Sequence, residues 1–135
     1  YVSITLKHLL QNNVWFYGSC YDEKKNAELI YNADLCVSPG NVGLTAIHSL
    51  VFGCPVITHD CFEWQMPEFE AIQAGVTGDF FKHDDTEDLT RVMSLWFADK
   101  KGKRDEIRKR CFNVIDTYWN PYYQMDVIRK NLILV

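Results

Sequence analysis

The stretch LCVSPGNVGLTAIHSLVFGCPVITHD, residues 35–60, decides the fold. Residues 35–37 and 55–58 are short apolar runs, rich in β-branched side chains and bounded by Pro and Gly. Such runs are typical of parallel strands that are buried on both faces. Between them the pattern predicts a helix over residues 44–52, so the stretch indicates a strand, a turn, a helix and a second strand.

The turn that enters this helix contains Gly40, Asn41 and Gly43. We expect these residues to take positive φ and to bring the backbone close to a ligand. The first N–H groups of a helix have no acceptor within the helix, and here they would point back at the turn. A turn of this kind predicts a binding site for an anion such as a phosphate.

Working outward, residues 14–17 predict a further strand that is closed by Gly18, and residues 79–81 predict a fourth. Asp22 is expected to cap a helix before the central stretch, and Asp85 or Thr86 to cap one after the fourth strand. Further helices are predicted over residues 67–74, stopping at Gly75, over residues 100–118 and 122–134, and at residues 1–10. The alternation predicts an α/β fold, with a doubly wound, Rossmann-like, mainly parallel sheet and helices on both faces.

Polar residues follow the second central strand, at the carboxyl end where open α/β sheets bind ligands. His59, Asp60, Glu63 and Gln65 are therefore candidates for contacting a ligand. A metal site at His59, Asp60 and Cys61 is not expected, because three consecutive side chains in a loop do not easily converge on one ion.

These motifs resemble the donor site of retaining glycosyltransferases of GT-B architecture, group 1 or family 4-like, which use nucleotide-sugars. The shared positions are Ser38, Gly43, Leu44, Gly53, Pro55, Val56 and Ile57, together with residues 14–18 (VWFYG), 33–35, 70–78 (EAIQAGVTG) and 84–89 (DDTEDL). The family places two glutamates eight positions apart, where this chain has Gly40 and His48. The resemblance therefore predicts the C-terminal half of a GT-B fold with altered sugar contacts.

The resemblance implies a nucleotide-sugar-binding C-terminal domain over residues 1–135, with the acceptor domain and the first donor-domain strand upstream. The full-length protein would transfer a sugar from a nucleoside-diphosphate sugar to a glycan or lipid-linked acceptor, with retention, in polysaccharide biosynthesis. No metal or other cofactor is implied, no catalytic residue is assigned, and the fragment alone would be inactive. The expected donor-binding residues are Tyr17, Gly18, Gly40, Asn41, Val42, Gly43, Leu44, Thr45, His48, His59 and Asp60.

Several residues have an ordinary structural explanation beside the functional one. Trp15 and Phe16 fit the core of a strand as well as a loop that holds the nucleotide base, and Glu70 fits an exposed helix as well as the edge of a donor pocket. His48 replaces a glutamate that binds ribose in the family, but it also fits a histidine that is satisfied by neighbouring backbone. Two other functions stay open: a nucleotide-sugar epimerase of the same architecture and a non-catalytic binding domain.

The length and composition of the chain limit which of these hypotheses are possible. With 135 residues, 47% of them hydrophobic, the chain is expected to form one domain. A net charge of −4 argues against nucleic acid as a partner. The five cysteines are odd in number and lack C-x-x-C spacing, which favours reduced thiols in a cytoplasmic protein. The basic residues between 100 and 110 fit a solvated helix face, and peripheral membrane association of the full-length protein stays open.

Overall fold

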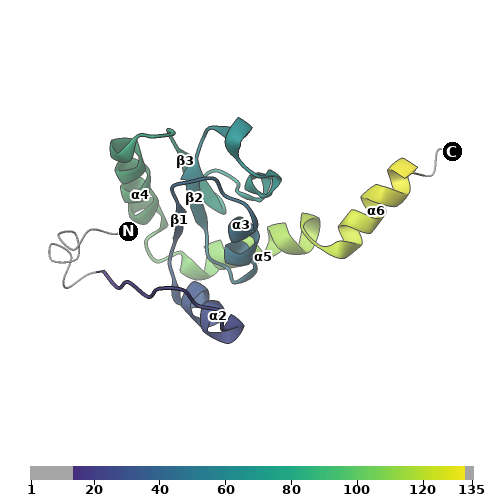
Figure 1. Ribbon diagram of the computed structural model, residues 1–135, viewed down its shortest axis with the longest axis horizontal. Helices are drawn as coiled ribbons and strands as arrows, with labels where there is room; N and C mark the ends of the chain where they lie inside the picture. Colours follow the sequence, from purple (N-terminus) through teal and green to yellow (C-terminus); the bar gives the residue numbers. More distant parts are fainter. Residues whose placement is uncertain (1–13, 133–135) are drawn as a thin grey trace.

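The computed structural model describes residues 14–132, which form a three-stranded parallel sheet with helices packed around it (Figure 1). The helix expected at residues 1–10 lies outside the described residues. In chain order the elements are α2 (Glu23–Asn32), β1 (Cys36–Ser38), α3 (Leu44–Val51), β2 (Val56–His59), η1 (Phe62–Trp64), η2 (Pro67–Ala71), β3 (Gly78–Phe81), α4 (Thr86–Lys100), α5 (Arg104–Tyr118) and α6 (Pro121–Leu132).

The sheet has the strand order β1-β2-β3, and both pairs are parallel. Val37 of β1 pairs with Ile57 of β2, which pairs in turn with Asp79 of β3. Every residue of β2 is buried, as expected for a central strand covered on both faces. The predicted strands at 35–37, 55–58 and 79–81 are thus confirmed to within one residue at each end.

Helices cover both sides of the sheet. Figure 1 shows α4 on one side, and α3 and α5 on the other. The core between these layers contains Ala46 and Leu50 of α3, Ile57 of β2, Trp96 of α4 and Cys111 of α5. The α/β, Rossmann-like class predicted from the sequence is therefore confirmed.

Two aspartates start their helices as predicted. The Asp22 carboxylate accepts hydrogen bonds from the N–H groups of Lys24 and Lys25, at 2.9 and 3.2 Å, and so caps α2. Asp85 caps α4 by accepting from the N–H of Asp88 at 2.9 Å. These bonds satisfy N–H groups that have no acceptor within the helix, which explains why both helices begin where they do.

The predicted strand at residues 14–17 is wrong. This segment has no strand structure, and Trp15, Phe16 and Tyr17 are all exposed, Trp15 to 70%. A strand requires a neighbour that shares its hydrogen bonds, and among residues 14–132 no strand pairs with this segment. The idea that Trp15 and Phe16 belong to a strand core is therefore wrong as well.

Two predictions about turns and glycines also need correction. The helix expected over residues 67–74 is a shorter 3₁₀ helix, η2, and Gly75 lies in the turn that leads into β3 instead of ending a helix. Gly40, Asn41 and Gly43 do not take positive φ; Gly43 has φ −133°. Positive φ occurs instead at Gly18, Gly53, Gly75 and Gly102, and at Asp84.

The last helix, α6, projects from the body of the molecule (Figure 1). All of its residues are exposed, including Tyr122, Ile128 and Leu132. This helix therefore presents apolar side chains to solvent. None of the helices between residues 14 and 132 combines the length and the apolar character needed to cross a membrane.

Gly78 allows β2 and β3 to approach each other, and this predicts a stability effect. A Cβ atom at Gly78 would lie 1.8 Å from the Val56 carbonyl oxygen, so the strands would have to separate. We expect Gly78→Ala to lower the free energy of unfolding by about 1–3 kcal/mol, the usual range for overpacking a core. Gly40→Ala is the control, because a Cβ there meets nothing within 4 Å. Urea unfolding measures both, and equal stability of the two variants would contradict the explanation.

Candidate functional site

The carboxyl ends of the three parallel strands lie at one edge of the sheet. β1 ends at Ser38, β2 at His59 and β3 at Phe81, and each is followed by a loop. Open α/β sheets bind ligands at this edge. Most of the donor-binding residues predicted from the sequence lie here, namely Gly40, Asn41, Val42, Gly43, Leu44, Thr45, His59 and Asp60.

The amino end of α3 lies at this edge and lacks a side-chain cap. Gly43 is its N-cap residue and has no side chain, and no other side chain caps the helix. Leu44 is 62% exposed and Thr45 is also exposed. No side chain therefore occupies the first N–H groups of α3, and the helix dipole adds positive potential at the same point.

Gln65 fixes the loop that leads into α3. The Val42 N–H donates to Gln65 Oε1 at 2.5 Å, while Gln65 Nε2 donates to Thr58 Oγ1 at 3.1 Å and to the His59 carbonyl at 3.0 Å. The Met66 N–H also donates to the Val42 carbonyl at 3.1 Å. The side-chain amide of Gln65 thereby joins the loop to the end of β2.

Thr58 adds a second connection to this loop. Its hydroxyl donates to the Gly40 carbonyl at 3.3 Å, and Thr58 itself is fully buried. Gly40 and Val42 are thus held by two different side chains. Buried polar groups that all find partners make such a segment rigid, because an unpaired group would lose its hydration without compensation.

His59 holds Asn41 and is not available to a ligand. Its side chain is fully buried, although the residue is a predicted donor-binding residue. Nδ1 accepts a hydrogen bond from the Cys61 N–H at 3.2 Å, so Nε2 carries the proton and donates to Asn41 Oδ1, also at 3.2 Å. Burial lowers the pKa of His59, and the neighbouring His83 lowers it further. The ring is therefore a neutral support of the loop.

Asp60 and His83 connect β2 with the end of β3. Asp60 Oδ1 accepts from the His83 N–H at 3.0 Å, and the Asp60 N–H donates to the Phe81 carbonyl at 2.9 Å. The His83 ring lies against that of His59, with 4.6 Å between centroids, and against that of Trp64, with 4.8 Å. Sequence reasoning missed Trp64 and His83, although His83 lies just after β3 as Asp60 lies just after β2.

The other predicted residues lie apart from this network. His48 is exposed on α3, and its side chain makes no hydrogen bond or ion pair within residues 14–132, so the proposed satisfaction by neighbouring backbone is not observed. The side chain lies one turn after Leu44, on the exposed side of the helix. Tyr17 and Gly18 are exposed in the segment before α2, where Gly18 has φ +83° and Tyr17 packs edge-on against Trp15.

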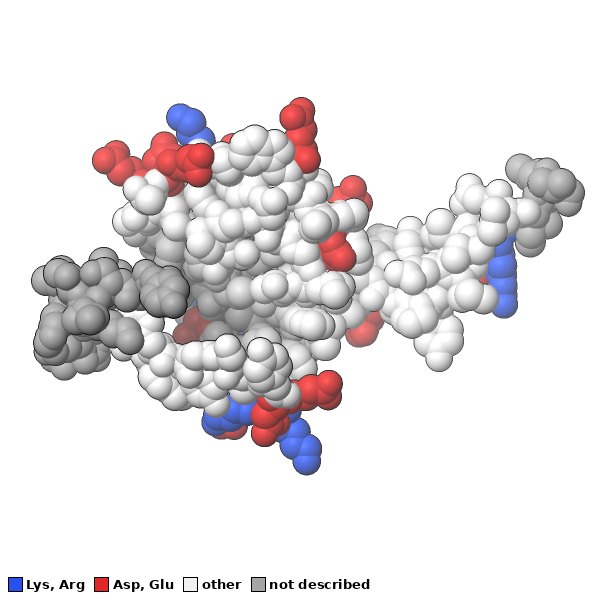
Figure 2. Space-filling view, viewed as in Figure 1, with Lys and Arg blue, Asp and Glu red and all other residues white. Residues whose placement is uncertain are grey.

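The candidate site is poor in charged side chains. Residues 39–45 include no Lys, Arg, Asp or Glu. Figure 2 shows charged side chains mostly at the edges of one face, over α4 and α2 and toward the end of α6, with further acidic side chains at the top and right of the body. A broad middle of this face is largely uncharged. β1 and α3 lie in that middle in the same view (Figure 1). An anion at this edge would therefore meet backbone N–H groups before it met a charged side chain of this loop.

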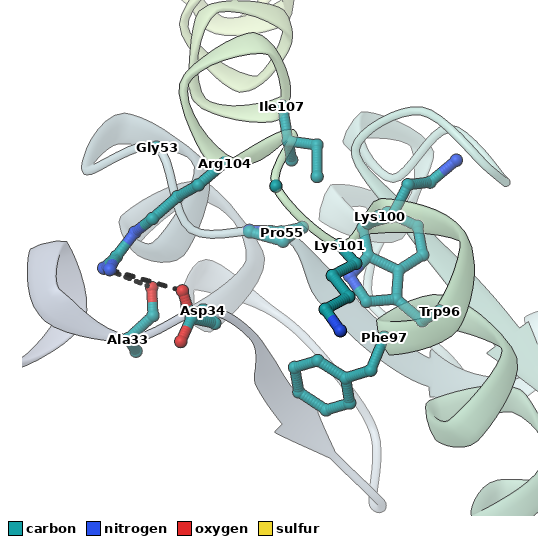
Figure 3. A pocket seen from close by; sticks show the side chains of 11 residues that line it. Ala33, Asp34, Gly53, Pro55, Trp96, Phe97, Lys100, Lys101, Arg104 and Ile107 are labelled. Atoms are coloured by element: carbon teal, nitrogen blue, oxygen red, sulfur yellow. Dashed lines mark hydrogen bonds and ion pairs between the residues drawn. The ribbon is translucent and has the colours of Figure 1, made fainter.

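Two hollows lie elsewhere on the molecule. One, of about 210 Å³, lies at the amino edge of the sheet, between the Arg104–Asp34 ion pair and the side chains of Phe97 and Lys101 (Figure 3). Another, of about 540 Å³, lies between η2, α5 and α6 and includes Glu70. Neither contains a predicted donor-binding residue. Between residues 14 and 132 no group of three His, Cys, Asp or Glu side chains is arranged to hold a metal ion.

Comparison with known protein families gives one match. The model of the family described as "Glycosyl transferases group 1" matches residues 1–113. The matched region contains the sheet, α2, α3, α4 and most of α5. No curated protein and no solved structure matches the chain significantly.

The buried His59 predicts a pH-dependent stability. The pKa of His59 in the folded state is lowered from the ordinary value of 6.5. As the pH falls below about 6.5, the unfolded chain therefore binds a proton at His59 while the folded chain binds it less readily. We expect the free energy of unfolding to fall between pH 7.5 and pH 5.5, and to fall less in His59→Gln. Urea unfolding at the two pH values measures this difference. The same loss in both proteins would show that another group causes it.

Proposed function

The chain belongs to the group 1 glycosyl transferases, and we propose that it binds the nucleotide-sugar donor of a glycosyl transfer reaction. One observation carries the proposal: the amino end of α3 is uncapped and exposed at the carboxyl edge of the sheet. The loop before it is held by Gln65, Thr58 and His59. Family membership supports glycosyl transfer in general, and this geometry suggests how the chain contributes to it.

The diphosphate of the donor would bind at the amides of Gly43, Leu44 and Thr45. Helix amino ends bind phosphate well, because their N–H groups and the helix dipole both favour negative charge. As the bond to the sugar breaks, negative charge grows on the leaving diphosphate. N–H donors that are already fixed in place stabilise this charge without first having to reorganise. The proposed mechanism therefore needs no metal ion at this position.

The ribose would bind at His48. This residue shares the exposed side of α3 with Leu44 and Thr45, the proposed contacts of the diphosphate. A neutral imidazole accepts one hydrogen bond and donates another, which suits a pair of neighbouring hydroxyl groups. His48 would thus replace the ribose-binding glutamate of the family, while Gly40 leaves the position of the other glutamate without a side chain.

The nucleotide base would contact the segment before α2. Tyr17 offers a half-exposed flat ring, and the positive φ of Gly18 turns the backbone there. Asn41 and Asp60 would complete the surroundings of the donor, with His59 acting through Asn41 instead of touching the donor itself. Val42 is fully buried and its N–H and carbonyl are bonded to Gln65 and Met66, so it would support the loop instead of contacting the donor. These are changes from the direct contacts expected for His59 and Val42 from the sequence.

The remaining parts of the reaction are proposals that follow from the resemblance. The acceptor would be a glycan or a lipid-linked saccharide, and the transfer would retain the anomeric configuration. A cytoplasmic role in polysaccharide biosynthesis, with peripheral membrane association, fits such an acceptor. A non-catalytic binding domain is the alternative that Gly40 and His48 favour, since both replace glutamates. Assaying sugar transfer by the full-length protein distinguishes the two.

A proline at the first position of α3 tests the phosphate site. Proline is favoured at this position of a helix, so Leu44→Pro should fold while losing one N–H donor. A hydrogen bond to a charged group contributes about 1.5–3 kcal/mol, which corresponds to a loss of affinity of roughly tenfold or more. Titrating UDP, GDP and ADP into the protein and its variant, with amide NMR detection, measures this loss.

Thr86→Pro is the matched control, because Thr86 is the first residue of α4 and also follows a strand of the sheet. It should bind the nucleoside diphosphate as the parent does. If Leu44→Pro folds and also binds like the parent, the phosphate does not lie at the amino end of α3.

Replacing His48 tests the ribose contact. We expect His48→Ala to weaken nucleoside diphosphate binding several-fold, because one neutral hydrogen bond contributes about 0.5–1.5 kcal/mol. Val51→Ala changes another exposed residue of the same helix and should leave the affinity unchanged. Isothermal titration calorimetry measures both variants. A folded His48→Ala protein of parental affinity would assign the ribose to other residues.

A further inference from the structure

Three aromatic rings form a chain from the interior to the surface beside the proposed donor site. The buried ring of His59 packs edge to face against that of His83, at 4.6 Å and 77°, and His83 packs likewise against Trp64, at 4.8 Å and 85°. Trp64 is 58% exposed. The proposed nucleotide contacts use neither Trp64 nor His83, so this end of the chain of rings has no assigned role.

The polar groups beside Trp64 are also held in place. The backbone N–H of His83 is fixed by Asp60, and the His83 Nδ1 lies 3.4 Å from a carboxylate oxygen of Asp84. Asp84 has φ +58°, a conformation that few residues other than glycine adopt, and its side chain is 89% exposed. An oriented imidazole therefore packs against the indole ring, and an exposed carboxylate lies beside that imidazole.

This combination matches the chemistry of a sugar ring. A pyranose presents C–H groups on its faces, which pack on an aromatic ring, and hydroxyl groups at its rim, which need hydrogen-bond partners. Trp64 offers the ring, while His83 and Asp84 offer a nitrogen and carboxylate oxygens for hydroxyl groups. Because the indole is held by packing against His83, a ligand would lose little side-chain entropy on binding to it.

The position of the three residues connects them to the donor loop. Trp64 lies in η1, directly after β2, and the same short segment supplies Gln65, which holds Val42. His59, at the other end of the chain of rings, holds Asn41. Trp64 is thus attached to the same framework that fixes the entry to α3.

We propose that Trp64, His83 and Asp84 form a binding platform for one pyranose ring of the saccharide substrates. This deepens the proposed function and rests on it, since the ring belongs either to the donor or to the acceptor. Trp64 supplies the flat contact surface, and His83 and Asp84 bind hydroxyl groups at the edge of the ring.

Binding measurements on Trp64→Ala, with Trp64→Phe as the conservative variant, test the platform. Tyr122→Ala is the control, because it removes another exposed aromatic ring, on α6. Each protein is titrated with UDP, UDP-glucose, GDP and GDP-mannose. Each is also titrated with the methyl pyranosides of glucose, galactose, mannose and N-acetylglucosamine, with NMR detection of the Trp64 indole N–H in the proteins that retain Trp64.

If the platform holds the donor sugar, Trp64→Ala weakens binding of a nucleotide-sugar about three- to tenfold without changing that of the matching nucleoside diphosphate. If it holds the acceptor sugar, the same variant weakens binding of a methyl pyranoside by a similar factor. Trp64→Phe should restore most of the affinity in either case, and Tyr122→Ala should have no effect.

The proposed platform is wrong if no saccharide shifts the NMR signal of the Trp64 indole N–H and Trp64→Ala leaves the affinity for every ligand unchanged. This outcome differs from failure of the proposed donor site, in which UDP and GDP do not bind to the parent protein. The methyl pyranosides still test the platform in that case, because their binding does not require a nucleotide site.

Discussion

The hydrogen bonds of the Gln65 side chain are the interaction on which the rest of the site depends. A single amide accepts from Val42 and donates to both Thr58 and the His59 carbonyl. The Gly40–Gly43 loop contains no regular structure of its own, so its backbone groups need partners from elsewhere. Gln65, in the segment after β2, supplies such a partner for the Val42 N–H. This hydrogen bond sets where α3 begins relative to the sheet.

Much of the fold could be predicted from local patterns. Asp22 and Asp85 are caps whose effect depends on neighbouring N–H groups, so their helices begin where the sequence indicates. β2 is recognisable because a central strand is apolar throughout. Residues 14–17 have equally suitable side chains, but strand formation depends on a partner elsewhere in the structure, which a local pattern does not report. The same reason applies to η2, where local propensity predicted a longer helix over residues 67–74 than the 3₁₀ helix that forms.

The candidate site could be predicted only in part. The turn and the start of the helix at Gly43 lie at the carboxyl edge of the sheet, as predicted, because this placement follows from chain order alone. The roles of His59 and Gln65 could not be read in this way. His59 ends β2 and Gln65 lies in the segment after it, and both have polar side chains, so the sequence suggested that they contact a ligand. In the structure both side chains instead bind the loop before α3. Whether such a side chain faces a ligand or its own backbone depends on contacts between distant segments.

These supports are consistent with a site that has few charges of its own. Backbone N–H groups bind an anion strongly only when they are already oriented, since otherwise part of the interaction is lost in ordering them. Thr58 and His59 are fully buried polar residues, and each holds the loop before α3. A buried polar group without a partner is unfavourable, so these bonds resist displacement of the loop. The neutral state of His59 is part of this arrangement, because protonation would remove the acceptor of the Cys61 N–H and leave a charge in the interior.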